Sequence, residues 1–128
     1  LWVDVRGVNN ESIARTLEAI KAEANAVAEN DGVAIEFEML TADKPVALSE
    51  ELAKKAEAIC EAEGIDYLHM NSGAGHDAMH MAKLAPTTMI FIPCKEGISH
   101  NPAEFAKLED ICRAVEVLAK LLESEANE

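Results

Sequence analysis

Apolar residues recur along the chain with two periods, one typical of strands and one typical of helices. Residues 1–6 alternate, so that Leu1, Val3 and Val5 share one face, and residues 33–39 alternate in the same way. Both segments predict half-buried strands. Between them, apolar residues recur at steps of three and four and predict a helix with one apolar face: Ile13, Leu17, Ile20, Ala24 and Val27. Residues 1–41 therefore predict a β-α-β unit with one polar face.

Residues that favour helix ends bound the helices of this pattern. Asn9 or Asn10 is placed to cap the first helix, and Gly32 to end it. After the segment TADKP, a candidate boundary between lobes, Ser49 and Gly64 are placed in the same way around a second helix. The inward residues expected of that helix are Leu52, Ala56 and Ile59.

The remaining segments alternate between strand-like and helix-like patterns. DYLHM predicts a short strand, HDAMHMAKLA a short helix, and TTMIFIP a strand buried on both faces. A last helix is expected from Asn101, with Pro102 at its first position and Glu104 in a capping-box position. Its apolar stripe is Phe105, Leu108, Ile111, Cys112, Val115, Leu118 and Leu122. The order α-β-α-β-α predicts an α/β fold with a mainly parallel sheet.

Charge and cysteine usage narrow the classes of function. The net charge is −13, which repels phosphate backbones and anionic lipids, so nucleic acid and membranes are poor partners. No apolar run approaches the length of a membrane span, and we expect a soluble, cytoplasmic protein. Cys60, Cys94 and Cys112 are odd in number and widely spaced, which argues against a disulfide framework. Cys60 and Cys112 lie on apolar helical stripes and are expected in the core.

Two glycine-bearing loops, NSGAGHDA and CKEGISHNP, follow the two expected parallel strands and carry one histidine each. Ligands of open α/β sheets bind at that edge, so these loops predict a site. The structural alternatives stay open: His76 can simply cap its helix, and His100 can be a solvated loop residue. His76 and His80 have a spacing that can bind a metal on a helix, although neighbouring methionines favour a buried face. Arg6 is ordinarily a surface charge, with Asp4 as a same-face partner.

The stretch MNSGAGHDAMHMAKLAPTTMIFIPCKEGISHNPAEF resembles the C-terminal signature of the zinc-dependent amidohydrolases. These include N-carbamoyl-L-amino-acid hydrolases, allantoate amidohydrolases and β-ureidopropionases, within the carboxypeptidase-like metallopeptidases. The start, LWVDVRG, is similar to a strand of the dimerisation (lid) domain of the same family. The resemblance implies that residues 1–42 are part of a lid domain and residues 46–128 the C-terminal part of a catalytic metallohydrolase domain.

The same resemblance implies roles for four residues. His100 matches the last ligand of a divalent metal (zinc, or manganese, nickel or cobalt). His76 matches a residue that contacts the substrate, and the Gly75 backbone borders the same pocket. Arg6 matches the lid arginine that binds the carboxylate of a small-molecule substrate. The intact enzyme would hydrolyse linear C–N bonds of N-carbamoyl amino acids or allantoate-like ureides as a homodimer or higher homo-oligomer.

The chain departs from the family pattern because the other metal ligands and the catalytic glutamate are missing from it. They would lie upstream of Leu1, so the chain is expected to be a fragment that is inactive alone. One histidine is too few for a catalytic zinc site, which needs about three protein ligands. Two alternatives remain: a non-catalytic dimerisation or assembly module that keeps the fold, and an aminoacylase or dipeptidase of the same superfamily.

Overall fold

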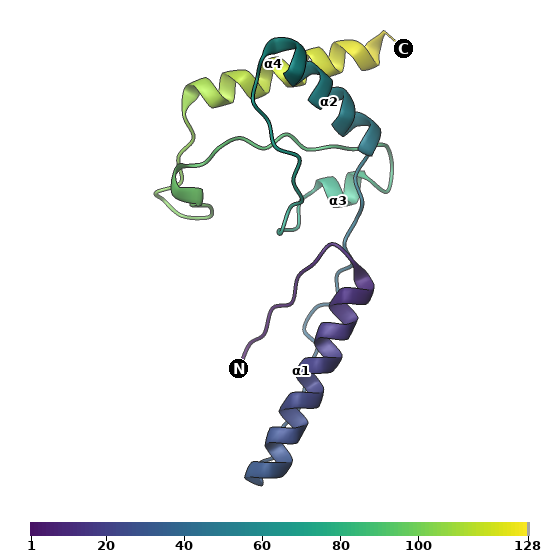
Figure 1. Ribbon diagram of the computed structural model, residues 1–128, viewed down its shortest axis with the longest axis vertical. Coiled ribbons are helices and arrows are strands. Elements are labelled where there is room, and N and C mark those ends of the chain that lie inside the picture. The colour runs from purple at the N-terminus through teal and green to yellow at the C-terminus, as the bar shows by residue number, and fades with distance from the viewer. Residues whose placement is uncertain (128) are drawn as a thin grey trace. The chain divides into compact units, whose positions relative to one another are not determined.

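The computed structural model describes residues 1–127 as helices joined by extended and looped segments (Figure 1). In chain order the elements are α1 (Asn10–Asp31), α2 (Glu50–Glu63), α3 (Ala78–Met81), the 3-10 turn η1 (Lys95–Gly97) and α4 (Leu108–Ala126). The chain divides into two compact units, each described by itself. The first comprises residues 1–46 and 71–75, and the second comprises the described residues of 47–70 and 76–128.

The ends of α1 and α2 lie where the sequence predicts them. The Asn9 side chain accepts a hydrogen bond from the Ser12 N–H, and the Ser49 hydroxyl accepts one from the Leu52 N–H. At the other ends, Gly32 and Gly64 adopt left-handed conformations with φ of 66° and 65°. Each supplies the positive φ that reverses the chain after a helix, which residues with a Cβ adopt only with strain.

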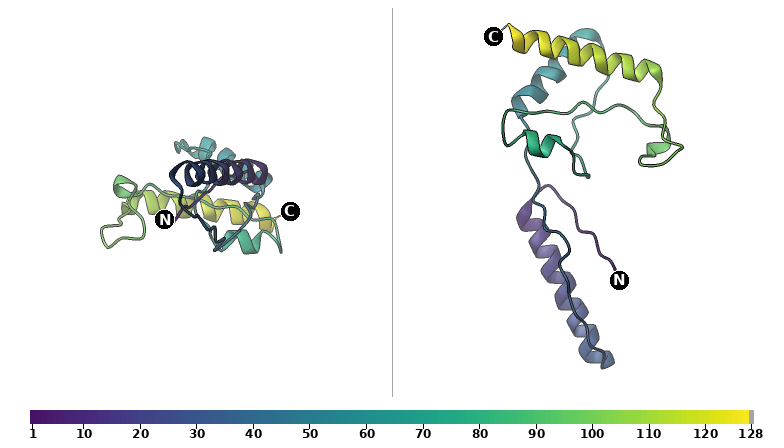
Figure 2. Two further views of the ribbon diagram at one scale, coloured as in Figure 1. Left: turned by 90° about the horizontal axis from the view of Figure 1, so that it is seen from below. Right: turned by 180° about the vertical axis from the view of Figure 1, so that it is seen from behind.

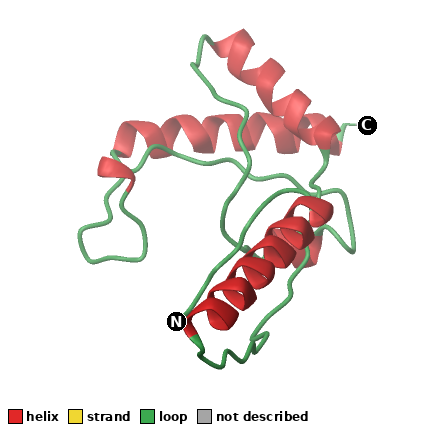
Figure 3. Ribbon diagram, turned by 60° about the horizontal axis from the view of Figure 1, so that its bottom comes forward, coloured by secondary structure: helices red, strands yellow, loops and turns green. Residues whose placement is uncertain are grey.

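The predicted α/β fold with a parallel sheet is wrong for the residues that the structure describes. Residues 1–127 contain no β-strand, and only helices and loops are drawn in Figure 3. The four segments expected as strands are extended but do not pair with one another. The TTMIFIP segment is not buried on both faces, since Phe91 is 45% exposed. Alternation along a sequence reports which face of a segment can be buried. A β-strand also requires hydrogen bonds to an adjacent strand, and alternation in the sequence does not predict whether such a strand is present.

The last helix begins at Leu108 and not at Asn101. The Asn101 side chain accepts the Ala103 N–H at 2.9 Å, and the Asn101 carbonyl accepts the Glu104 N–H at 2.9 Å, which closes a single turn. The Phe105 carbonyl then accepts the Lys95 N–H at 2.8 Å, so it is used by a distant residue and not by a helical turn. Lys107 is still extended, with φ −71° and ψ 143°. The short helix expected over residues 76–85 is also reduced, to Ala78–Met81, with further turns up to Ala85.

The second unit has a small core where α2 packs against α4 (Figures 1 and 2). Cys60 of α2 and Val117 and Leu121 of α4 are its buried apolar residues. Ion pairs join the same helices at their margins: Lys55 to Glu125 at 2.7 Å, and Lys120 to Glu63. Val117 and Leu121, the buried residues of α4, are not among the residues of the apolar stripe predicted for the last helix.

All seven residues of the predicted apolar stripe are exposed in the described part of the chain. Leu108 is 72% exposed, Leu122 is 61% exposed, and Cys112 is exposed although core packing was expected. The helical period correctly places these residues on an apolar face of α4. However, α2 contacts only part of α4, so most of that face stays uncovered.

Candidate functional site

The Arg6 side chain holds two segments of the first unit together. Its Nε and Nη2 donate to Oδ2 of Asp4 at 2.9 and 2.7 Å, and its Nη1 donates to the Gly73 carbonyl at 3.1 Å. The hydrogen bond to Arg6 is the main cause that lowers the pKa of Asp4, and the same bond raises the pKa of Arg6. The Asp4 partnership was expected from the sequence. The hydrogen bond to Gly73 was not expected, because no periodic sequence pattern predicts a contact between residues so far apart in the chain.

Two N–H donors of Arg6 are not used by Asp4 or Gly73. A guanidinium carries five N–H groups, and the three bonds to Asp4 and Gly73 leave one each on Nη1 and Nη2. The Arg6 side chain is 61% exposed. Two N–H groups at the end of a planar fork are the donors that a carboxylate accepts in a bidentate contact. Arg6 can thus bind an anion while Asp4 fixes the other edge of its guanidinium.

The NSGAG loop forms a tight turn closed by Ser72. The Ser72 hydroxyl accepts the Ala74 N–H at 3.1 Å and donates to the Ala74 carbonyl at 3.0 Å. A Cβ added at Gly73 would meet nothing within 4 Å, so the loop backbone is open on that side. Gly75 ends the part of this loop that belongs to the first unit.

His76 starts the α3 turn in the second unit. Its carbonyl accepts the Met79 N–H at 2.9 Å, and its ring meets the Phe91 ring edge-on with centroids 5.8 Å apart. His76 and His80 have no third ligand beside them: residues 1–127 contain no group of three or more His, Cys, Asp or Glu residues that could hold a metal.

His100 lies at the surface of the loop before α4, with an unusual backbone conformation. Its φ is 54°, in the left-handed region that residues with a Cβ rarely adopt, and only Glu96 shares this property among the other non-glycine residues described. The His100 N–H donates to the Glu104 carboxylate at 2.8 Å. Nothing in residues 1–127 bonds to its ring nitrogens, so the imidazole is available to a ligand.

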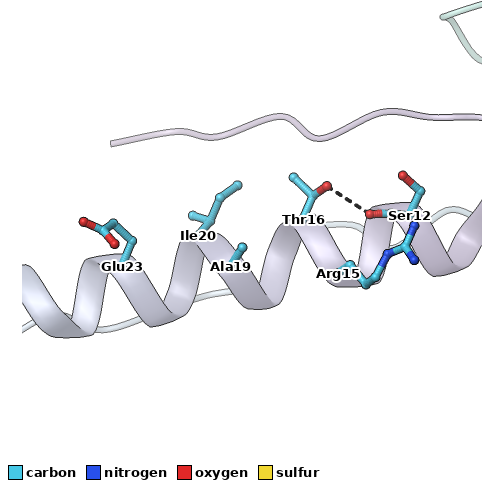
Figure 4. Close-up of a pocket in the computed structure, with 6 residues that line it drawn as sticks. All are labelled: Ser12, Arg15, Thr16, Ala19, Ile20 and Glu23. Atoms are coloured by element: carbon cyan, nitrogen blue, oxygen red, sulfur yellow. Dashed lines mark hydrogen bonds between the residues drawn. The ribbon is translucent and has the colours of Figure 1, made fainter.

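Two hollows of the surface lie away from the predicted site residues. An open depression of about 620 Å³ runs along α1, and the residues that line it project from one side of that helix (Figure 4). A groove of about 280 Å³ lies between residues 88–92 and α4 and is lined mostly by apolar side chains. Arg6, Gly75, His76 and His100 line neither. Arg6 and Gly75 belong to the first unit, and His76 and His100 to the second.

The comparison with protein families decides the affiliation of the chain. A sequence model described as peptidase family M20/M25/M40 matches residues 5–124. The chain belongs to this family. The resemblance to carboxypeptidase-like amidohydrolases that the two histidine loops predict is thereby confirmed. No helix of the M20 chain within residues 1–127 is long and apolar enough to cross a membrane.

Several curated relatives match nearly the whole of the M20 chain. An uncharacterised hydrolase of Haemophilus influenzae is 41% identical over 98% of the chain and 31% of its own length. The allantoate amidohydrolase of Escherichia coli is 34% identical over 94% of the chain and 29% of its own length. An N-carbamoyl-L-amino-acid amidohydrolase of a Pseudomonas strain is 34% identical over 91% of the chain and 28% of its own length. The chain thus spans less than a third of the length of these relatives.

Solved structures show the same affiliation. An amidase of the hydantoinase/carbamoylase family from Burkholderia multivorans superposes with a TM-score of 0.92 and 33% identity, over 95% of the M20 chain and 30% of the amidase. AtUAH in complex with glyoxylate superposes with a TM-score of 0.75 and 31% identity, over 93% of the chain and 29% of that protein.

Proposed function

We propose that this chain is part of a metal-dependent amidohydrolase that cleaves linear C–N bonds of N-carbamoyl amino acids or allantoate-like ureides. One observation carries the proposal: relatives named for these two activities match more than nine tenths of the chain at 34% identity. The family match, over residues 5–124, includes both histidine loops and Arg6. The substrate is a small molecule that carries a carboxylate, and the enzyme is proposed to be cytoplasmic and to act as a homodimer or higher homo-oligomer.

Arg6 is proposed to bind the substrate carboxylate. Two features support this role: the guanidinium is oriented by Asp4, and one N–H on each terminal nitrogen remains for a further acceptor. His76 and the Gly75 backbone are proposed to contact the substrate. The Gly75 role is supported by the open, tightly turned loop, and the His76 role by its exposed position at the following turn. The first unit would then hold the acid end of the substrate.

His100 is proposed to be one ligand of a divalent metal: zinc, or manganese, nickel or cobalt. Its imidazole is exposed and has no partner within residues 1–127, which suits a ligand role. The chain does not fit a complete metal site, because no group of three candidate ligands exists among its described residues. A catalytic zinc ion takes about three protein ligands, so the others must come from outside this segment. A divalent metal in such an enzyme supplies a Lewis acid for the scissile carbonyl.

The proposal is tested by the substrate range of an intact enzyme that contains this chain. Ammonia and product release would be measured with a panel of N-carbamoyl amino acids, allantoate and ureidoglycolate, with N-acetyl amino acids and dipeptides as the comparison set. Turnover of at least one carbamoyl or ureide substrate, with little turnover of the comparison set, is expected. Turnover confined to N-acetyl amino acids or dipeptides would overturn the proposal in favour of an aminoacylase or dipeptidase.

A further inference from the structure

Phe91 packs its ring against the imidazole of His76 within the second unit. The ring centroids lie 5.8 Å apart, and the ring planes meet at 66°. Edge-to-face pairs of aromatic rings prefer centroid separations of about 4.5–7 Å, so this contact is in the favourable range. His76 lies just before α3 and Phe91 lies on the extended segment that follows it. The contact therefore joins two separate segments of the same unit.

The backbone at His76 is fixed by the turn that begins there. The His76 carbonyl accepts the Met79 N–H at 2.9 Å and closes a turn at the start of α3. This bond sets where the side chain begins but not where its ring points, because a histidine side chain still rotates about two torsions. A second ring packed against the imidazole limits that rotation. The Phe91 contact thus contributes to the orientation of the ring, which the backbone leaves open.

The position of Phe91 follows from the segment in which it lies. Thr88, Ile90 and Ile92 line the groove between this segment and α4. Alternate side chains of an extended segment point to opposite sides, so Phe91 projects from the side away from the groove. One side of the segment therefore faces α4, and the other side carries the ring that contacts His76.

Phe91 contributes little to the core of the second unit. Its side chain is 45% exposed, whereas the buried apolar residues of that unit lie where α2 packs against α4. Stabilisation by an apolar side chain scales with the area that it removes from water, so a ring that is nearly half exposed stabilises the fold less than a buried one. The main effect expected of the Phe91 ring is on the imidazole that it contacts.

We propose that Phe91 is a positioning residue whose ring orients the His76 imidazole so that it can contact the substrate. This proposal rests on the proposed role of His76 in substrate binding. Immobilising a side chain on binding costs affinity, and an imidazole that is already oriented loses less freedom when the substrate arrives. Removal of the Phe91 ring should therefore weaken substrate binding without removing a reacting group.

The test uses an intact enzyme that contains this chain, with whichever carbamoyl or ureide substrate it turns over. It compares Phe91→Leu, Phe91→Tyr, His76→Gln and the double variant that combines Phe91→Leu with His76→Gln. Phe37→Leu is the matched control, because Phe37 has a similar exposure of 48% and no ring contact is described for it within residues 1–127.

Three measurements are made on each variant. Steady-state kinetics would separate KM from kcat. NMR would record the resonances of the His76 ring protons, which are assigned by their loss in His76→Gln, because an aromatic ring shifts the resonances of protons close to it. Thermal denaturation would establish that each variant is folded.

Phe91→Leu is expected to raise KM by about 2- to 10-fold, the range that an aromatic contact supplies, with kcat nearly unchanged. It should also shift the His76 ring-proton resonances, whereas Phe91→Tyr keeps the ring and should restore both properties. Phe37→Leu should match the unaltered enzyme. In the double variant, Phe91→Leu should add no loss to that of His76→Gln, since the effects of residues that act through one another are not additive. If Phe91→Leu does not fold, Phe91→Met takes its place.

Contrary outcomes separate the parts of the argument. An unchanged KM in folded Phe91→Leu, while His76→Gln raises KM, would overturn the positioning role alone. A loss in the double variant equal to the product of the two single fold-changes would also overturn it, since Phe91 would then act independently of His76. Unchanged kinetics in His76→Gln would overturn the proposed role of His76. Lack of turnover of every carbamoyl and ureide substrate would overturn the proposed function itself.

Discussion

Arg6 shows how a single exposed side chain can be oriented by other residues of its own chain. Asp4 holds one edge of its guanidinium and the Gly73 carbonyl accepts from one terminal nitrogen, although both partners lie in loops or extended segments. Exposed ion pairs contribute little to stability, so this arrangement has little value as a stabilising contact. The arrangement instead fixes the orientation of the guanidinium, so that its two remaining N–H groups donate in a defined direction.

In the intact enzyme, Arg6→Lys is expected to raise KM or lower kcat/KM by about 10- to 100-fold for carboxylate substrates, a loss of about 1.4–3 kcal/mol. An ammonium group cannot make the bidentate contact of a guanidinium, even though the charge is kept. Steady-state kinetics on an N-carbamoyl amino acid would measure the change. Arg15→Lys, at an exposed position on α1, serves as the control and should leave the kinetics unchanged. Equal kinetics for both variants would show that Arg6 does not bind the carboxylate.

At the residue scale, the sequence predicted Arg6, Gly75, His76 and His100 as site residues, and those roles stay predictions. The structure adds bonds that the sequence could not indicate, notably Arg6 to Gly73 and His100 to Glu104. Both hydrogen bonds depend on the path by which a loop brings a later residue back to an earlier one. No periodic pattern in the sequence predicts that path. Hydrogen-bonding capacity can be read from a residue type, whereas the partner cannot.

The helices illustrate what local signals decide at the scale of an element. α1 and α2 begin and end at the residues that capping rules indicate, because a side-chain acceptor at the start and a left-handed glycine at the end act within a few residues. The start of α4 was mispredicted for a non-local reason: the Phe105 carbonyl is bonded to Lys95, ten residues earlier.

The glycine that ends α2 gives a direct test of this local control. Gly64→Ala is expected to lower the free energy of unfolding by about 1–2 kcal/mol, because a residue with a Cβ is strained in the left-handed region. Gly73→Ala is the matched control: a Cβ at either position would meet nothing within 4 Å, but only Gly64 has a positive φ, of 65°. Urea denaturation of the purified chain would compare the two. Similar losses for both would contradict the explanation by backbone conformation.

At the scale of the whole molecule, the described chain has a small core and much exposed apolar surface. Three apolar residues are buried in residues 1–127, whereas Trp2 is 88% exposed and Phe37 is 48% exposed. Many other large apolar side chains in this range are exposed as well, among them Leu1, Val3, Ile35 and Met39. The chain also spans less than a third of the length of the relatives described above.

We expect the purified chain to self-associate through exposed apolar residues of the first unit, such as Trp2 and Phe37. Light scattering at about 50 µM should show a dimer or larger species, since weak association becomes visible in that range. Replacing Trp2 and Phe37 by Ser should lower the associated fraction, whereas replacing Glu36 and Glu38 by Ser should not. A monomer at that concentration would contradict the expectation.

The purified chain is also expected neither to bind zinc tightly nor to hydrolyse N-carbamoyl amino acids. No group of three or more candidate ligands is found among residues 1–127, and fewer than about three protein ligands do not hold a zinc ion tightly. Calorimetric titration with zinc and an ammonia-release assay would check both statements. A dissociation constant below about 1 µM that is lost in His76→Ala and His80→Ala would reveal a self-contained site and contradict this reading.

The sequence by itself determined the family, the ends of α1 and α2, and the positions of the histidine loops. Each of these depends on residue identity at short range: capping side chains, left-handed glycines, and motifs such as SGAGHDA and GISHNP. The tertiary structure alone decided that the alternating segments do not form strands in residues 1–127, and that the apolar face of α4 stays mostly uncovered. Pairing and burial both require a neighbouring surface, and a linear pattern specifies which side of a segment is apolar without specifying what lies against it.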